Sequence, residues 1–213
     1  SQIDSLFIEE LNTGREMISR LSGIPTVLEF QYRDQITRKN YIKTSALLKY
    51  IGMFEIGNPD LRVYIDFPRS GCRIDSSGIV DTAPITDGRY ILFTSHLAGE
   101  TQDHLQLVPD VTVTTDEGSY TANILMLETE KRAVRVVYPQ VQRNGLLESA
   151  LREDASVGAV LSPDGGILAH TEGFSLPGGF DTPQAAVDAL NTQEVGKNYE
   201  FDTRETKDGL SII

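Results

Sequence analysis

Between Leu61 and Tyr138 the sequence is a nearly continuous series of strand-like segments separated by turn signals. In the first of them, residues 61–67, every second residue is apolar, and Arg62, Tyr64 and Asp66 occupy the positions between. A period of two is typical of a strand that buries one face. This tract therefore constrains the fold more than any other part of the chain.

Turn signals divide the tract into short segments. Pro68 to Gly71, Asp87-Gly88 and Asp116 to Ser119 are typical turn sequences. Short connections favour antiparallel strands, because a parallel crossover needs about a dozen residues or more. The further strands expected are residues 72–74, 79–80, 89–94, 104–108, 111–114, 120–127 and 133–138, the last two forming a hairpin.

The flanking regions differ in character from this tract. Residues 3–21 repeat apolar positions at steps of three and four, which predicts an amphipathic helix. Residues 26–32 resemble a strand, whereas residues 40–51 are ambiguous between strand and helix. After Tyr138 we expect a helix over 145–152, a hairpin formed by 157–161 and 167–170, a helix over 182–190 and a polar tail.

These patterns predict an α+β, β-rich fold. We expect one or more small antiparallel barrels, SH3-like or similar, or an antiparallel sheet, with an N-terminal helix and a C-terminal α/β appendage. Three regions follow by composition: residues 1–58 with the helix and short strands, 59–139 with the central β domain, and 140–213 with a hairpin, a helix and an acidic tail.

The charge is negative and unevenly placed. The chain has 213 residues and a formal net charge of −12. Residues 1–60 hold 7 basic and 8 acidic side chains, which leaves 12 basic and 23 acidic side chains for residues 61–213. A negative surface repels phosphate backbones and anionic lipids, so neither direct nucleic-acid binding nor membrane docking is expected.

The composition also limits the cofactor chemistry that we expect. A single cysteine, Cys72, excludes an intramolecular disulfide and a thiolate metal cluster. The histidines are His96, His104 and His170; the first two flank a loop that contains Glu100 and Asp103, but loops commonly hold exposed histidines beside acidic residues, so neither a metal nor another cofactor is expected. Neither a signal peptide nor a membrane-spanning apolar run is visible, which favours a cytoplasmic or virion location.

The sequence contains no recognised catalytic motif and no complete family signature. There is no Gly-x-Ser-x-Gly elbow, Ser-x-x-Lys pair or P-loop, so no catalytic residue is predicted. Residues 173–180 resemble the approach to a Nudix box, but the following helix lacks the glutamates of that family. Residues 88–92 are similar to the core of WYL domains, which are ligand-sensing regulators, without the other basic residues of that pattern. Neither resemblance identifies a family.

Three functional hypotheses follow. The main one is a non-enzymatic structural or assembly protein in a multimeric particle, with a tailed-phage virion as its concrete form. Exposed strand edges and a polar tail suit docking to protein partners in a homo- or hetero-oligomer. A third hypothesis is an unrecognised enzyme whose acidic residues, such as Asp66, Asp75 and Asp87, gather at the mouth of a barrel.

The alternative hypothesis is a regulatory ligand-binding module. Its pocket would lie in the central barrel and would take a nucleotide-like ligand. The expected ligand-binding residues are Tyr64, Arg73, Arg89 and Tyr90, which combine aromatic rings with guanidinium groups in the central tract.

Overall fold

The structure is a computed structural model of the full chain, and it describes residues 2–81, 92–94, 102–115, 117–152, 157–161, 166–174, 204–205 and 211–212. The chain divides into two compact units, which we describe separately. One contains residues 10–139, and the other contains residues 1–9 and 140–213. The three regions expected from the sequence were defined by composition and not by compactness, and they stay a prediction.

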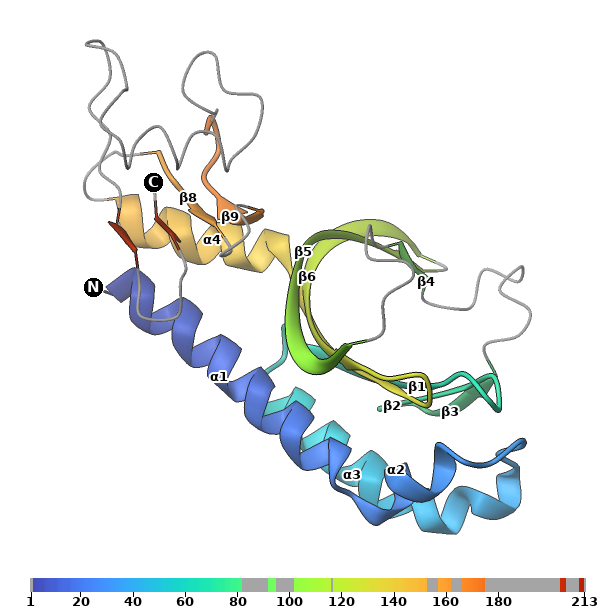
Figure 1. The fold of residues 1–213 in the computed structure, drawn as a ribbon. Coiled ribbons are helices and arrows are strands. Elements are labelled where there is room, and N and C mark those ends of the chain that lie inside the picture. Colours follow the sequence, from blue (N-terminus) through green and yellow to red (C-terminus); the bar gives the residue numbers. More distant parts are fainter. Residues whose placement is uncertain are drawn as a thin grey trace. The chain divides into compact units, whose positions relative to one another are not determined.

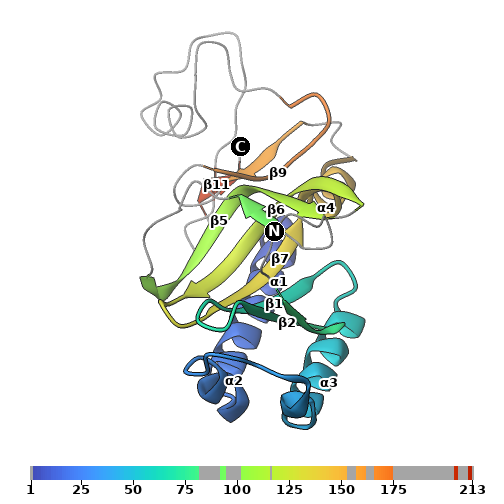
Figure 2. The same ribbon diagram turned by 90° about the vertical axis from the view of Figure 1, so that its right-hand side faces the viewer.

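The larger unit is built on a seven-stranded antiparallel sheet (Figures 1 and 2). Its strand order is β3-β2-β1-β7-β6-β5-β4. Two sequential ladders, β1 to β3 and β4 to β7, are joined by the long-range pairing of β1 with β7. The strands are β1 (Arg62–Phe67), β2 (Cys72–Asp75), β3 (Gly78–Asp81), β4 (Leu92–Thr94), β5 (Gln102–Thr115), β6 (Gly118–Glu128) and β7 (Ala133–Pro139).

Three helices cover one side of this sheet, which we call the outer face (Figure 1). They are α1 (Gln2–Ser22), of which residues 10–22 belong to this unit, α2 (Pro25–Phe30) and α3 (Tyr41–Gly57), with a short 3-10 turn, η1 (Arg38–Asn40), before α3. Phe30 of α2 meets Phe67 of β1 edge to face at 6.0 Å between ring centroids. The Tyr138 hydroxyl of β7 donates a 2.7 Å hydrogen bond to the backbone oxygen of Glu10 in α1.

The opposite side of the sheet, which we call the inner face, lies inside its curl (Figure 1). The register breaks between Val108 and Val111 of β5, and Asp110 has a positive φ of 55° there. A bulge of this kind bends a strand and increases its twist. Residues 104–108 and 111–114 are therefore one bent strand, whereas the sequence predicted two.

The α+β class and the antiparallel sheet are confirmed, but the expected barrel is not. Among the described strands, β3 and β4 are the two ends of an open order and do not pair with each other. The SH3-like fold is likewise not confirmed. The antiparallel sheet, which the prediction gave as the alternative to a barrel, is what the structure shows.

The smaller unit combines helix α4 (Gln140–Leu151) with a four-stranded sheet of order β10-β11-β8-β9. Gln140, Asn144 and Glu148 share one side of α4, and each is hydrogen-bonded to the backbone of residues 167–172. The helix thus satisfies backbone groups on and just beyond the edge strand β9. The strands are β8 (Ala159–Leu161), β9 (Ile167–His170), β10 (Arg204–Glu205) and β11 (Ser211–Ile212).

Several local predictions can be compared with these elements. The N-terminal helix and the 157–170 hairpin are confirmed, and α4 begins earlier than expected. The chain end lies against its own unit, because β11 pairs with β8. The strand expected at 26–32 is wrong, since α2 begins at Pro25, and residues 41–51 of the ambiguous segment lie within α3. The helix expected at 182–190 lies outside the described residues.

Gly14 is a sharp test of the packing between α1 and β7. A Cβ at this position would overlap the Tyr138 hydroxyl and lie 3.2 Å from Leu125 Cδ2. We therefore expect Gly14→Ala to lower the free energy of unfolding by about 1–3 kcal/mol, as overpacking does. Gly52 in α3 has nothing within 4 Å of its Cβ position. Gly52→Ala should instead stabilise the protein by up to about 1 kcal/mol.

Denaturant unfolding followed by circular dichroism measures both changes. Tyr138→Phe removes the overlapping oxygen, so Gly14→Ala should cost less in that background than in the native chain. An equal cost in both backgrounds would show that the hydroxyl does not limit the approach of α1.

Candidate functional site

Three charged side chains meet on the inner face at the junction of β2, β1 and β7. Arg73 donates to both carboxylate oxygens of Asp66, from Nε at 2.5 Å and from Nη2 at 3.0 Å. Arg135 donates from Nη1 to the second of these oxygens. The strand register explains the meeting, because Arg73 lies opposite Asp66 and Arg135 lies opposite the neighbouring Tyr64.

The cluster is largely removed from solvent. The side chains of Arg73, Arg135 and Asp66 are 9%, 14% and 19% exposed. Charge-assisted hydrogen bonds are strong in such surroundings, and the pairing offsets part of the cost of desolvating each ion. Two guanidinium groups share one carboxylate, so the three side chains carry a net charge of +1.

Tyr64 forms an aromatic wall beside this cluster. Its ring lies under the Arg73 guanidinium, with Cζ 5.5 Å from the ring centroid, which is within the range of a cation–π contact. Burial raises the pKa of Tyr64, and the nearby Tyr120, Asp75 and Glu55 raise it further, while Arg73 acts in the opposite direction. The phenol is therefore held in its neutral, hydrogen-bonding form.

An apolar surface continues from the charged cluster across the same face. Arg135 is flanked in the register by Tyr64 on β1 and by Met126 on β6. Beyond them is a cluster of buried side chains with Tyr120 packed against it: Val108, Val111, Val113, Ala122, Ile124 and Val137. The inner face thus places both signs of charge next to an aliphatic surface.

The expected ligand-binding residues can now be located. Tyr64 and Arg73 lie together on the inner face, whereas Arg89 and Tyr90 lie outside the described residues. That any of these four binds a ligand stays a prediction. Sequence reasoning did not place Arg135 or Asp66 beside them, although a charged residue inside a buried strand pattern was a usable signal for both.

The acidic residues of the enzyme hypothesis are engaged in other contacts or lie outside the described residues. Asp66 is occupied by two guanidinium groups, and Asp75 accepts a 2.8 Å hydrogen bond from the backbone nitrogen of Ser77. Asp87 lies outside the described residues. Within the described ranges, no three histidine, cysteine or acidic side chains are placed to hold a metal ion.

Two solved structures share the fold. One is the sensory domain of the Campylobacter jejuni chemoreceptor Tlp3 (CcmL) with isoleucine bound, at 12% identity and a TM-score of 0.53, covering 99% of this chain and 84% of that one. The other is the ligand-binding domain of Campylobacter jejuni Tlp3 in complex with 4-methylisoleucine, at 8% identity and a TM-score of 0.51, covering 99% and 83%. No family model and no curated protein matches the sequence. At these identities the likeness shows the fold.

These comparisons correct the main functional hypothesis. The assembly protein, with its tailed-phage virion form, is contradicted because the matching structures are chemoreceptor sensory domains. The alternative hypothesis of a ligand-binding module fits them better. The virion location was part of the assembly hypothesis, and the cytoplasmic location stays a prediction. None of the described helices is long and apolar enough to cross a membrane.

The ionic cluster predicts a large difference between two aspartates. Asp66→Asn removes the charge that Arg73 and Arg135 share, and breaking a buried pair in this way costs about 3–5 kcal/mol of unfolding free energy. Asp34 pairs with Arg69 at 2.6 Å, but its side chain is 79% exposed. Asp34→Asn should therefore cost no more than about 1 kcal/mol. Denaturant unfolding of the two variants measures this contrast, and equal costs would contradict it.

The pKa values of Tyr64 and Tyr32 are shifted in opposite directions from that of an ordinary tyrosine. Tyr64 ionises late, so Tyr64→Phe should remove absorbance from the most alkaline part of a native-state phenol titration. A hydrogen bond from the Lys131 ammonium, at 3.2 Å, lowers the pKa of Tyr32. Tyr32→Phe should remove absorbance from the earliest part.

The raised pKa of Tyr64 also has a stability consequence. Below a pH of about 10 the phenol is neutral in both the folded and the unfolded chain. Above it, the unfolded chain ionises first, so the stability contributed by Tyr64 is lost as the pH rises toward the folded pKa. Tyr64→Phe should flatten this alkaline decline in unfolding free energy. An unchanged slope would contradict the burial of the phenol.

Proposed function

We propose that the chain is a non-enzymatic sensory domain that binds a small amino acid with an aliphatic side chain on the inner face of the larger unit. The observation that carries this proposal is the juxtaposition of the Asp66 cluster with the apolar surface around Met126 and Val137. The fold shared with a sensory domain that holds isoleucine supports it.

The chemistry of the inner face suits a zwitterion. A ligand carboxylate would face the guanidinium groups of Arg73 and Arg135, since planar guanidinium donors match a carboxylate. A ligand ammonium would face Asp66 and the Tyr64 ring, which attract cations by charge and by the ring quadrupole. The aliphatic side chain would lie on the apolar surface, where burial contributes roughly 25 cal/mol per Å².

An amino acid replaces the nucleotide-like ligand that the sequence suggested, because isoleucine and 4-methylisoleucine are the ligands of the matching structures. A protein or domain that receives the signal is part of this proposal, and it takes the place of the expected assembly partner. Neither nucleic acid nor a membrane surface is needed as a partner.

Calorimetric titration and thermal shift with L-isoleucine test the proposal. A ligand at 100 times its Kd should stabilise the protein by about 2.7 kcal/mol. Isoleucinamide, which lacks the carboxylate, and N-acetylisoleucine, which lacks the ammonium, should each bind at least about tenfold more weakly, a difference of about 1.4 kcal/mol. AMP and cyclic dinucleotides, which represent the nucleotide-like ligand suggested by the sequence, are titrated for comparison.

Matched arginine variants locate the binding. Arg73→Met and Arg135→Met should weaken isoleucine binding, whereas Arg69→Met, which removes an exposed arginine from the Arg69–Asp34 pair, should not. Lack of binding by any of the twenty amino acids would overturn the proposal. So would isoleucine binding that is equally strong in all three variants.

A further inference from the structure

A hollow lies on the outer side of the larger unit, away from the Asp66 cluster. It has a volume of about 640 Å³, which is within the usual range of small-molecule pockets. One wall is the segment Gln35 to Thr37 between α2 and α3, and Tyr41 at the start of α3 adjoins it. The other wall consists of Ser70, Cys72 and Ile79 from the β1–β2 turn, β2 and β3.

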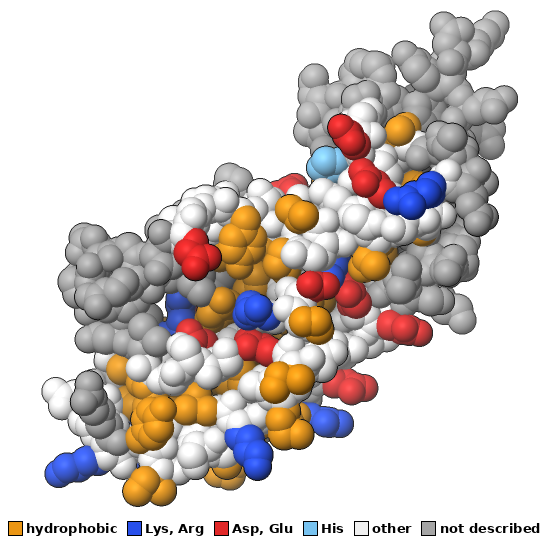
Figure 3. Space-filling view, turned by 180° about the vertical axis from the view of Figure 1, so that it is seen from behind, with side chains coloured by type: hydrophobic (Ala, Val, Ile, Leu, Met, Phe, Trp, Pro, Cys, Tyr) orange, Lys and Arg blue, Asp and Glu red, His pale blue; other side chains and the backbone are white. Residues whose placement is uncertain are grey.

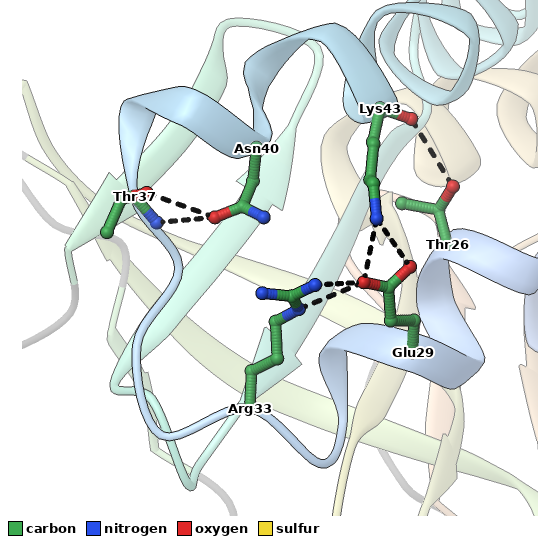
Figure 4. A network of polar contacts seen from close by, with 6 residues as sticks. All are labelled: Thr26, Glu29, Arg33, Thr37, Asn40 and Lys43. Carbon is green, nitrogen blue, oxygen red and sulfur yellow. Dashed lines mark hydrogen bonds and ion pairs between the residues drawn. The ribbon is translucent and has the colours of Figure 1, made fainter.

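Both ends of the loop wall are anchored (Figure 4). At its beginning, Glu29 of α2 binds Arg33 and also accepts from the Lys43 ammonium of α3 at 3.0 Å and 3.3 Å. At its end, the side-chain oxygen of Asn40 accepts from the backbone nitrogen and the hydroxyl of Thr37 at 3.0 Å and 3.1 Å. The wall is thereby fixed to two helices.

The two walls are also tied to each other. Asp34, just before the loop wall, accepts a 2.6 Å hydrogen bond from Nε of Arg69, which precedes Ser70 of the opposite wall. Tyr41 reaches toward the β2–β3 turn, where its hydroxyl is 3.8 Å from the position of a Cβ on Gly78. The Asp34–Arg69 pair therefore spans the two walls of the hollow.

The described lining is uncharged. It offers the amide of Gln35, the hydroxyls of Thr37, Ser70 and Tyr41 and the thiol of Cys72, together with the apolar side chains of Ile36 and Ile79. A carboxylate or an ammonium that entered would lose water without gaining a partner of opposite charge from these residues. A neutral molecule with an apolar body and one hydrogen-bonding group meets no such cost.

We propose that this hollow is a second ligand site, independent of the inner face, that takes an uncharged small molecule with an aromatic or aliphatic body and a hydroxyl or amide group. Figure 3 shows hydrophobic side chains interspersed with lysine and arginine over the end of the molecule where α2 and α3 lie. Leu28, Tyr32, Tyr41, Ile42, Met53 and Ile56 are the large exposed hydrophobic residues of this region.

The test compares three probes of one shape and different charge: benzyl alcohol, benzoate and benzylammonium. The full chain is labelled with ¹³C at isoleucine methyl groups and titrated with each probe by NMR. Benzyl alcohol should shift the methyl signals of Ile36 and Ile79 in a saturable way. Ile42 and Ile56 on α3, which are 86% and 82% exposed, are internal controls and should not shift. The two charged probes should bind at least tenfold more weakly.

Matched variants locate the binding independently of isoleucine. Ile36→Trp fills the hollow and should abolish the Ile79 shift, whereas Leu28→Trp places the same side chain on the exposed surface of α2 and should leave it. A second measurement covers the case in which Ile36→Trp does not fold. N-ethylmaleimide modifies Cys72, the one cysteine of the chain, and benzyl alcohol should protect this thiol in a saturable way.

Three outcomes would overturn this second site. The first is that the methyl shifts are largest for the most exposed isoleucines, and the second is that the charged probes bind as tightly as benzyl alcohol. The third is that benzyl alcohol still shifts the Ile79 signal in folded Ile36→Trp protein. Each is distinct from failure of the amino-acid proposal, which rests on Arg73 and Arg135 of the inner face.

Discussion

The pairing of β1 with β7 is the contact on which the larger unit depends. It joins residues 62–66 to residues 133–137 and fuses two sequential ladders into one sheet. Each ladder alone would expose an additional unpaired edge, at which another chain could pair. The same pairing sets Arg135 opposite Tyr64 and so brings it within reach of Asp66, 69 residues away in sequence. Fold and candidate site thus depend on one register.

The alternation of side chains along these strands gives the sheet two chemically different faces. Arg73 points to the ionic cluster of the inner face, while its neighbour Cys72 lines the uncharged hollow on the outer side. In the same way, Asp66 is paired with arginines and Phe67 packs on Phe30. A shift of one residue in register would exchange these environments and bury unpaired charge, so the charged residues help to specify the register.

The strands and the antiparallel order within each ladder could be predicted from sequence, because alternation and short turns are local signals. The β1–β7 contact could not, since a pairing over some 70 residues leaves no local trace. Residues 26–30 were misread because Thr26 and Val27 favour strands by propensity. Helical spacing was nevertheless present: Val27 and Phe30, three apart, are buried, and Leu28 between them is exposed. Tyr64 and Arg73 were found through their residue types, whereas the position of Arg135 beside them required the register.

The state of the acidic side chains bears on the choice between catalysis and binding. A general base needs an oxygen that can accept a proton from substrate. Asp66 instead accepts from two guanidinium groups, and Asp75 accepts from the backbone of its own turn. Arginine and carboxylate held in this way form a fixed polar frame beside an apolar surface. Under the proposed function, such a frame would orient a ligand through donors and acceptors of both signs, as recognition requires.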